Sequence, residues 1–301
     1  MLSPRLKALV RHIDDLPTLP RTVFRITEMI NNPRASAHDL ANVITDDQVL
    51  TARLLRLVNS SFYGFPQRIS TVTRAIVLLG FDAIRHLLLT TSVFDVFSNR
   101  NHATTPSRED LWDHSLGCAV AAKAIGRHIR HDKIEELFVC ALLHDIGKIV
   151  SMVYAPDDYY AAVRLAAEKD ILLIEAETEL FEFTHTDTGR LLAERWNLPV
   201  MVTKVIVHHH TPAQAGDFVQ DAAIVHLADI LCRALRYGSG GDNRIPALDP
   251  CVCDLLRIKE DHIDTLLREI ESDFNDIRPF TEAITTSASD GHDGLVTPAV
   301  L

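Results

Sequence analysis

Residues 138–148 read FVCALLHDIGK, an apolar run that changes into three ionisable side chains, His144, Asp145 and Lys148. The apolar residues before this triplet predict a helix that is buried rather than exposed. A charge in such surroundings costs free energy unless a partner compensates it. The run therefore predicts a helical core with a polar site inside it.

Helical spacing of apolar residues extends over nearly the whole chain. Leu40, Val43 and Ile44 share one helical face, and no segment shows the sustained alternation of a half-buried strand. We therefore expect an all-α fold. The glycine at Gly80 is expected to end one helix and to separate it from the next.

A change of composition at residues 99–108, rich in Asn, Thr, Pro, Ser and charges, predicts a linker between two helical lobes. We expect an N-terminal lobe over residues 1–105, a second lobe over 106–284 and a disordered tail over 285–301. The helices expected in the second lobe cover residues 109–130, 134–150, 156–169, 173–182, 186–196, 199–210 and 221–237.

The overall composition excludes some classes of protein. A formal net charge of -11 over 301 residues argues against a nucleic-acid groove, which needs clustered Lys and Arg. We find no apolar run approaching the roughly 20 residues of a membrane span and no secretory signal, so we expect a cytoplasmic protein. Five scattered cysteines fit a reducing compartment, and Cys251 and Cys253 are read as idle thiols rather than ligands.

Most of the fifteen histidines lie in the second lobe, and they suggest a metal site. Imidazoles combined with carboxylates suit Mn, Fe, Co, Ni or Zn, and two such ions together activate water for attack on phosphorus. Lys148, one turn after His144, is a candidate to hold a phosphate oxygen. The other candidates at helix ends or faces are His114, His185, His209, His210 and Asp229.

Plainer interpretations of these residues remain open. His144 and Asp145 are also compatible with a buried ion pair, and Lys148 with a lysine that extends from a helix end to solvent. His185 beside the expected cap Thr184 is compatible with a surface position. His226 either orients Asp229 or packs in the core.

The order of His114, His144-Asp145 and Asp229 resembles the HD superfamily of metal-dependent phosphohydrolases. The whole chain resembles its HDOD subfamily over about residues 10–280, and the likeness includes LPTLP at 16–20, LVNSSFYG at 57–64 and AIVLLG at 75–80. This resemblance implies one or two divalent transition metals. It implies a first ion held by His114, His144, Asp145 and Asp229, and a second held by Asp145 as a bridge with His185, His209 and His210.

Two details of the resemblance bear on the site. The two ligands among the three histidines at 208–210 could be the first two or the last two. The following Thr211-Pro212 favours His209 and His210. Asp110 falls where some relatives carry an extra acidic ligand, which would serve a third ion.

The chain departs from the relatives that hydrolyse cyclic dinucleotides, because the Gly-Tyr-Pro element expected soon after His210 is missing. We therefore expect a bacterial signal-transduction protein with an occupied metal site that hydrolyses a phosphoester, with Asp145 and Lys148 as catalytic groups and a phosphorylated small molecule as substrate. The alternative is a non-catalytic module with a structural or sensory metal. Its helical surface would bind a signalling protein such as a sensor kinase or a diguanylate cyclase.

Overall fold

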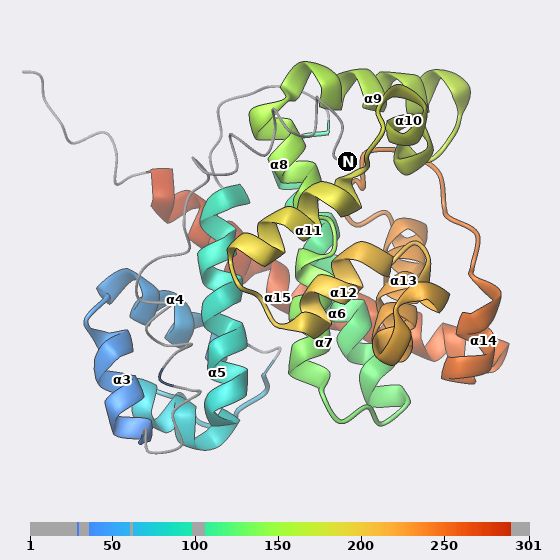
Figure 1. Cartoon of the computed structure of the whole chain (residues 1–301). Coiled ribbons are helices and arrows are strands. Elements are labelled where there is room, and N and C mark those ends of the chain that lie inside the picture. The colour runs from blue at the N-terminus through green and yellow to red at the C-terminus, as the bar shows by residue number, and fades with distance from the viewer. Residues whose placement is uncertain (1–28, 30–35, 61–62, 98–105, 290–301) are drawn as a thin grey trace, which may run out of the picture. The chain divides into compact units, whose positions relative to one another are not determined.

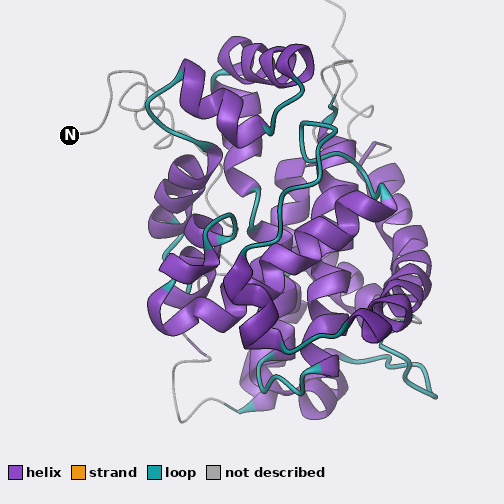
Figure 2. Cartoon of the chain, turned by 90° about the vertical axis from the view of Figure 1, so that its right-hand side faces the viewer, coloured by secondary structure: helices purple, strands orange, loops and turns teal. Residues whose placement is uncertain are grey.

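The computed structural model describes residue 29 and residues 36–60, 63–97 and 106–289. Within these ranges every regular element is a helix, and Figure 2 shows no strand among them. The expected all-α fold is therefore confirmed. The LPTLP segment at 16–20 and Phe62 lie outside the described residues.

The chain divides into two compact units. The first comprises residues 1–21 and 99–270, and the second comprises residues 22–98 and 271–301. Helix α15, Glu260–Ser289, starts in the first unit and ends in the second. It also continues past the point where we expected the C-terminal tail to begin, whereas residues 290–301 lie outside the described residues.

The second unit contains α3 (Ala37–Thr45), α4 (Gln48–Val58) and α5 (Val72–Phe97), which pack pairwise on one another. Helix α3 begins at a capping box, in which Ser36 and Asp39 satisfy each other's backbone N–H groups. Inside α5 the chain leaves the helical conformation at Gly80, where φ is 85°. This positive φ favours glycine, so the expected break at this residue is confirmed.

The first unit is built around three helices, α6 (Arg108–His128), α7 (Ile134–Leu143) and α13 (Val219–Leu235), which all pack against one another (Figure 1). Around them lie α8 (Ile146–Tyr154), α9 (Pro156–Lys169), α10 (Leu173–Leu180), α11 (His185–Arg195), α12 (Val200–His208), two short 3-10 turns (Pro212–Gln214 and Gly216–Phe218) and α14 (Pro250–Leu256). The helices expected in this part of the chain begin and end within a few residues of the expected limits, with one exception, whereas α14 and the two 3-10 turns had no expected limits.

The exception is the segment expected as one helix over residues 134–150. It is two helices, α7 and α8, separated by a turn at His144 and Asp145. Asp145 has φ −102° and ψ 12°, which no longer continues a helix. Gly147 then allows α8 to lie directly on α11, because a Cβ at this position would clash with the carbonyl oxygen of His185. The turn thus places the His-Asp pair at a junction of helices.

The segment Ile134–Tyr154 is long and apolar enough to cross a membrane by length and composition. Our expectation that no run approaches this length is therefore wrong. However, 89% of the apolar window is buried inside the structure, and the core helix of a water-soluble protein meets the same criterion. The segment forms the centre of the first unit.

Candidate metal centre

All seven predicted metal ligands meet in the first unit, in two adjacent groups. Group A consists of three of them, His114, His144 and Asp229, together with Cys118. Group B consists of the other four, Asp145, His185, His209 and His210. Within each group the ligand atoms lie within 4.8 Å of one another. The groups combine residues of α6, the α7–α8 turn, the first residue of α11, the turn after α12, and α13.

In group A, a carboxylate and two imidazoles converge from different helices. The Nε2 atom of His114 lies 3.2 Å from Oδ1 of Asp229 and 3.5 Å from Oδ2 of Asp145. The Nε2 atom of His144 lies 3.3 Å from the same Asp145 oxygen. Arg233, one turn after Asp229 on α13, donates from Nε to Oδ1 of Asp229 at 2.8 Å. This guanidinium fixes the carboxylate and balances its charge.

In group B, three imidazoles gather beside Asp145, and two of them face its other oxygen. Oδ1 of Asp145 lies 3.4 Å from Nε2 of His185 and 3.6 Å from Nε2 of His209. The Nε2 atoms of His185 and His210 are 3.1 Å apart. His208 is not a member of the group, and the structure thus brings in the last two of the three histidines at 208–210.

Asp145 joins the two groups, because its two oxygens face different sets of imidazoles. Oδ2 faces His114 and His144, and Oδ1 faces His185 and His209. Lys148, fully buried, donates to Oδ2 at 2.6 Å and to the carbonyl oxygen of Gly240 at 2.8 Å. The lysine therefore holds the central carboxylate in place.

Backbone and side-chain acceptors set the tautomers of three of the imidazoles. His144 donates from Nδ1 to the carbonyl of Ala141 at 2.6 Å, and His209 does so to the carbonyl of Ile206 at 2.9 Å. His185 donates from Nδ1 to Oε2 of Glu177 at 2.7 Å. Because carbonyl and carboxylate oxygens only accept, the proton lies on Nδ1. Each Nε2 lone pair is then free to ligate a metal, as is usual for metal-binding histidines.

The ionisation states of the carboxylates and of two imidazoles also suit a metal. Burial by itself raises the pKa of Asp145, but His144 and Lys148 hold it well below its usual range. Burial likewise raises the pKa of Asp229, and Arg233 holds it low. The pKa values of His209 and His210 lie well below the ordinary value, first because of burial and then because of neighbouring imidazoles. Metal ligands must be deprotonated, and the directions of these four pKa values favour that state.

His114 differs from the other imidazoles. Burial lowers its pKa, yet Cys118 and the carboxylates of Asp145 and Asp229 raise it well above the ordinary value. Two adjacent buried carboxylates require positive charge, and a divalent ion in group A would supply it and leave this imidazole deprotonated.

Three buried polar atoms test whether a divalent ion fits this centre. Nε2 of His144, Oδ1 of Asp145 and Nε2 of His209 have no hydrogen-bond partner among the described residues. Buried polar groups are nearly always satisfied, and these three acceptors all belong to the two ligand groups. An ion in group A would satisfy His144, and an ion in group B would satisfy Asp145 and His209, so the donor sets fit divalent transition metals.

Three residues that lie beside the predicted ligands were not identified from the sequence. Cys118 and Arg233 each stand four residues after a predicted ligand, His114 and Asp229, and this spacing on one helical face was a usable signal. Glu177 gave no such signal, since it lies in an acidic helix and belongs to a different helix from its partner His185.

The structure decides between the alternatives for His226 and corrects the expectation for Asp110. His226 is buried and contacts neither carboxylate oxygen of Asp229 among the described contacts. It donates from Nδ1 to the carbonyl of His209 at 2.7 Å, and its Nε2 accepts from the backbone N–H of Asp249. Asp110 lies outside both groups, because its Oδ2 accepts from the backbone N–H and hydroxyl of Ser107 in the capping box of α6.

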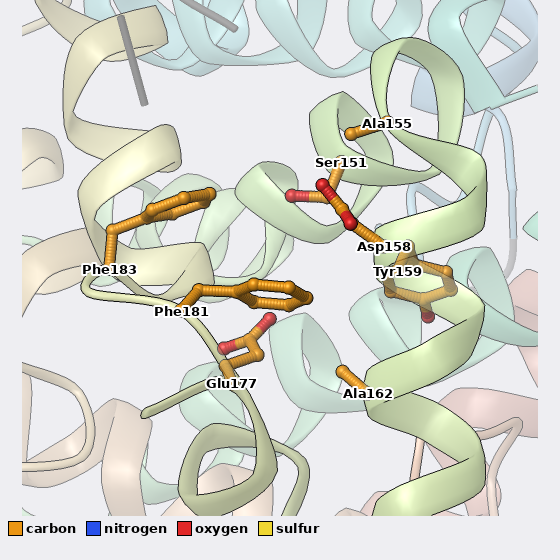
Figure 3. Close-up of a pocket in the computed structure, with 8 residues that line it drawn as sticks. All are labelled: Ser151, Ala155, Asp158, Tyr159, Ala162, Glu177, Phe181 and Phe183. Atoms are coloured by element: carbon orange, nitrogen blue, oxygen red, sulfur yellow. The ribbon is translucent and has the colours of Figure 1, made fainter. Parts of the chain in front are cut away.

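A small pocket lies on the side of Glu177 that faces α9. Figure 3 shows the Glu177 carboxylate beside the ring of Phe181, with Tyr159 and Asp158 on the opposite wall. The rings of Phe181 and Phe183 stack with centroids 5.7 Å apart. This apolar wall keeps Glu177 buried next to His185.

Known proteins resemble this chain over most of its length. An uncharacterized protein of Treponema pallidum (strain Nichols) is 26% identical over 270 residues, which is 89% of this chain and 51% of that protein. The chain thus spans about half the length of this relative.

Solved structures match along nearly the whole chain. An HDOD domain protein of unknown function from Geobacter sulfurreducens matches with a TM-score of 0.68 and 28% identity, covering 95% of this chain and 98% of the other. A protein of Shewanella amazonensis SB2B, which its name proposes as a phosphohydrolase, matches with a TM-score of 0.68 and 21% identity, covering 93% and 97%. At that identity the second match shows the fold alone.

The HDOD domain model matches residues 16–212, a range that includes six of the seven predicted ligands. Asp229 lies beyond this range, and the fold brings it beside His114. The chain belongs to the HDOD domain family.

Proposed function

We propose that groups A and B each bind one divalent transition metal and that the pair of ions hydrolyses a phosphoester. The observation that carries the proposal is the orientation of Asp145, whose two oxygens face different sets of imidazoles. A carboxylate in this position can ligate two ions at once. Two ions held close together lower the pKa of bound water and stabilise charge on phosphoryl oxygens.

The protein's own side chains position the reacting groups. Arg233 fixes Asp229, and Glu177 fixes the ring of His185. Lys148 holds Oδ2 of Asp145, and the described contacts engage two of the three N–H donors of its ammonium group. The third donor is the one we assign to a phosphoryl oxygen of the substrate, a phosphorylated small molecule.

A second candidate function is a non-catalytic module in a signalling pathway of the bacterial cytoplasm. The burial of the site favours it: six of the seven predicted ligands are at most 3% exposed, and only His210 is half-buried. A metal closed off by protein ligands is typical of a structural site. In this case the protein partner would be a signalling protein such as a sensor kinase or a diguanylate cyclase.

Metal analysis followed by an activity assay distinguishes the two functions. The purified protein is analysed for bound metals and then tested, with Mn²⁺ or Fe²⁺, on panels of phosphomonoesters and phosphodiesters. The proposal predicts two ions per chain and turnover of at least one substrate, which Asp145→Ala abolishes. Full metal loading without turnover would favour the non-catalytic module, and a chain without any bound metal would contradict both.

A further inference from the structure

We propose that Cys118 is a metal ligand of group A, and that its thiolate makes this group selective for a thiophilic divalent ion of the zinc type. The inference rests on the metal occupancy assumed in the proposed function. It adds a sulfur ligand beyond the histidines and carboxylates already described. Group B contains nitrogen and oxygen ligands alone.

The position of Cys118 is set by helix α6. It lies one turn after His114, so both side chains project from the same helical face. Its Sγ atom is 3.7 Å from Nε2 of His114, the atom that also faces Asp229. Bond lengths of about 2.1 Å to nitrogen and 2.3 Å to sulfur at a tetrahedral angle separate two ligand atoms of one ion by about 3.6 Å. The observed separation agrees with this value.

A second observation is that one ligand atom of group A has no partner in the described part of the chain. Nε2 of His144 belongs to the same group as Sγ of Cys118, is buried, and has no hydrogen-bond partner among the described residues. Its Nδ1 proton is already engaged by Ala141, so Nε2 presents a lone pair. An ion between His114, Cys118, His144 and Asp229, which Oδ2 of Asp145 would also reach, would satisfy this lone pair.

The ligand set explains why the two groups should prefer different ions. Thiolate ligands favour zinc and related soft or borderline ions, whereas imidazole and carboxylate ligands also accept Mn²⁺ and Fe²⁺. Group A has a sulfur and group B has none. The centre is therefore suited to hold two unlike metals, with the thiophilic ion on the side of α6 and α13.

Cobalt is a suitable probe, because a cobalt–thiolate bond gives an intense charge-transfer absorption in the near ultraviolet that imidazole and carboxylate ligands do not give. Cys251 and Cys253 stand two residues apart in the chain, and Cys253 is exposed, so they are a possible second source of this absorption. The experiment therefore starts from the Cys251→Ser/Cys253→Ser protein. It is loaded with Co²⁺ without added thiol, and bound cobalt is quantified.

The proposal predicts that this background protein shows the charge-transfer band and that Cys118→Ser removes it while cobalt remains bound. Cys140→Ser serves as the matched control, since this thiol is also buried and does not belong to group A. The control should retain the band. In competition, Cys118→Ser should also lower the preference of the chain for Zn²⁺ over Mn²⁺ by about tenfold or more.

X-ray absorption of the cobalt in the background protein gives an answer that does not depend on the folding of Cys118→Ser. A sulfur neighbour at about 2.3 Å supports the proposal, and a shell of nitrogen and oxygen alone overturns it. A band that persists in folded Cys118→Ser also overturns it. Bound cobalt without sulfur contradicts this inference alone, whereas the absence of bound cobalt contradicts the proposed function as well.

Discussion

Groups A and B share Asp145 but balance their charges differently. In group A, Asp229 has a guanidinium partner in Arg233, and Oδ2 of Asp145 has an ammonium partner in Lys148. In group B, Oδ1 of Asp145 and Nε2 of His209 lack a hydrogen-bond partner among the described residues. Protein cations thus balance the carboxylate charges on the side of group A, whereas the unpartnered atoms of group B depend on a bound ion. The two halves of the centre should respond differently to mutation.

The largest effect is expected at Asp145, because its substitution removes a ligand from both groups. Asp145→Ala should lower bound metal to well below half of the wild-type content, measured by mass spectrometry after removal of free metal. It also leaves Lys148 without its carboxylate, which costs about 3–5 kcal/mol for a buried pair. The double variant Asp145→Ala/Lys148→Met should recover part of this stability without recovering metal. Wild-type stoichiometry in either variant would refute the bridging role.

Variants that change one group at a time test whether the two groups bind their ions independently. Asp229→Ala removes a carboxylate from group A alone, and His209→Ala removes an imidazole from group B alone. Each should lose one of two bound ions and retain the other, so each variant is the control for its counterpart. Asp229→Ala should destabilise the fold more, because it leaves Arg233 with only Asp242 as a carboxylate partner among the described contacts. Loss of both ions in each variant would mean that the ions bind as a unit.

A smaller effect is expected from Glu177, which touches only group B. Glu177→Gln keeps an acceptor for Nδ1 of His185 but removes the charge, and loss of such partners weakens metal binding by about 10- to 100-fold. We expect the lower end of this range, measured by competition with a chromogenic chelator. Glu175→Gln is the matched control on the same helix, since Glu175 accepts from the backbone N–H of Leu172 and not from a ligand. Equal effects of the two substitutions would contradict the assigned role.

The smallest effect on metal is expected at Asp110, which the sequence made a candidate ligand of a third ion. Asp110→Ala should leave metal content unchanged and lower the free energy of unfolding by about 1 kcal/mol, because the capping box of α6 loses its acceptor. Ser107→Ala, which removes the other half of the same box, should have a similar effect in chemical denaturation. A drop in metal content for Asp110→Ala alone would place this carboxylate in the centre after all.

The fold class and the ligand types could be read from the sequence because both depend on local pattern. Apolar residues at helical spacing predicted the helices, and His144 and Asp145 were noticeable because they interrupt such a run. The turn at these two residues could not be predicted. It depends on the contact of Gly147 with α11, which is far away in the sequence.

The supporting residues of the site were harder to predict for a similar reason. Glu177 is one of several glutamates between residues 175 and 182, and only tertiary packing decides which of them is buried against His185. The backbone acceptors of His144 and His209 carry no side-chain signal at all. Cys118 and Arg233 could have been predicted, because an i to i+4 spacing from a ligand is visible in the sequence.

The turn inside the apolar segment Ile134–Tyr154 has a consequence for the newly synthesised chain. Before it folds, this segment has the length and hydropathy that the insertion machinery of a bilayer recognises. Asp145 and Lys148 stand near its middle, where each disfavours insertion by roughly 2.5–3.5 kcal/mol. The residues that organise the centre of the folded protein thus also disfavour insertion of the newly synthesised chain into a membrane. Substituting both by apolar residues would remove both of these contributions.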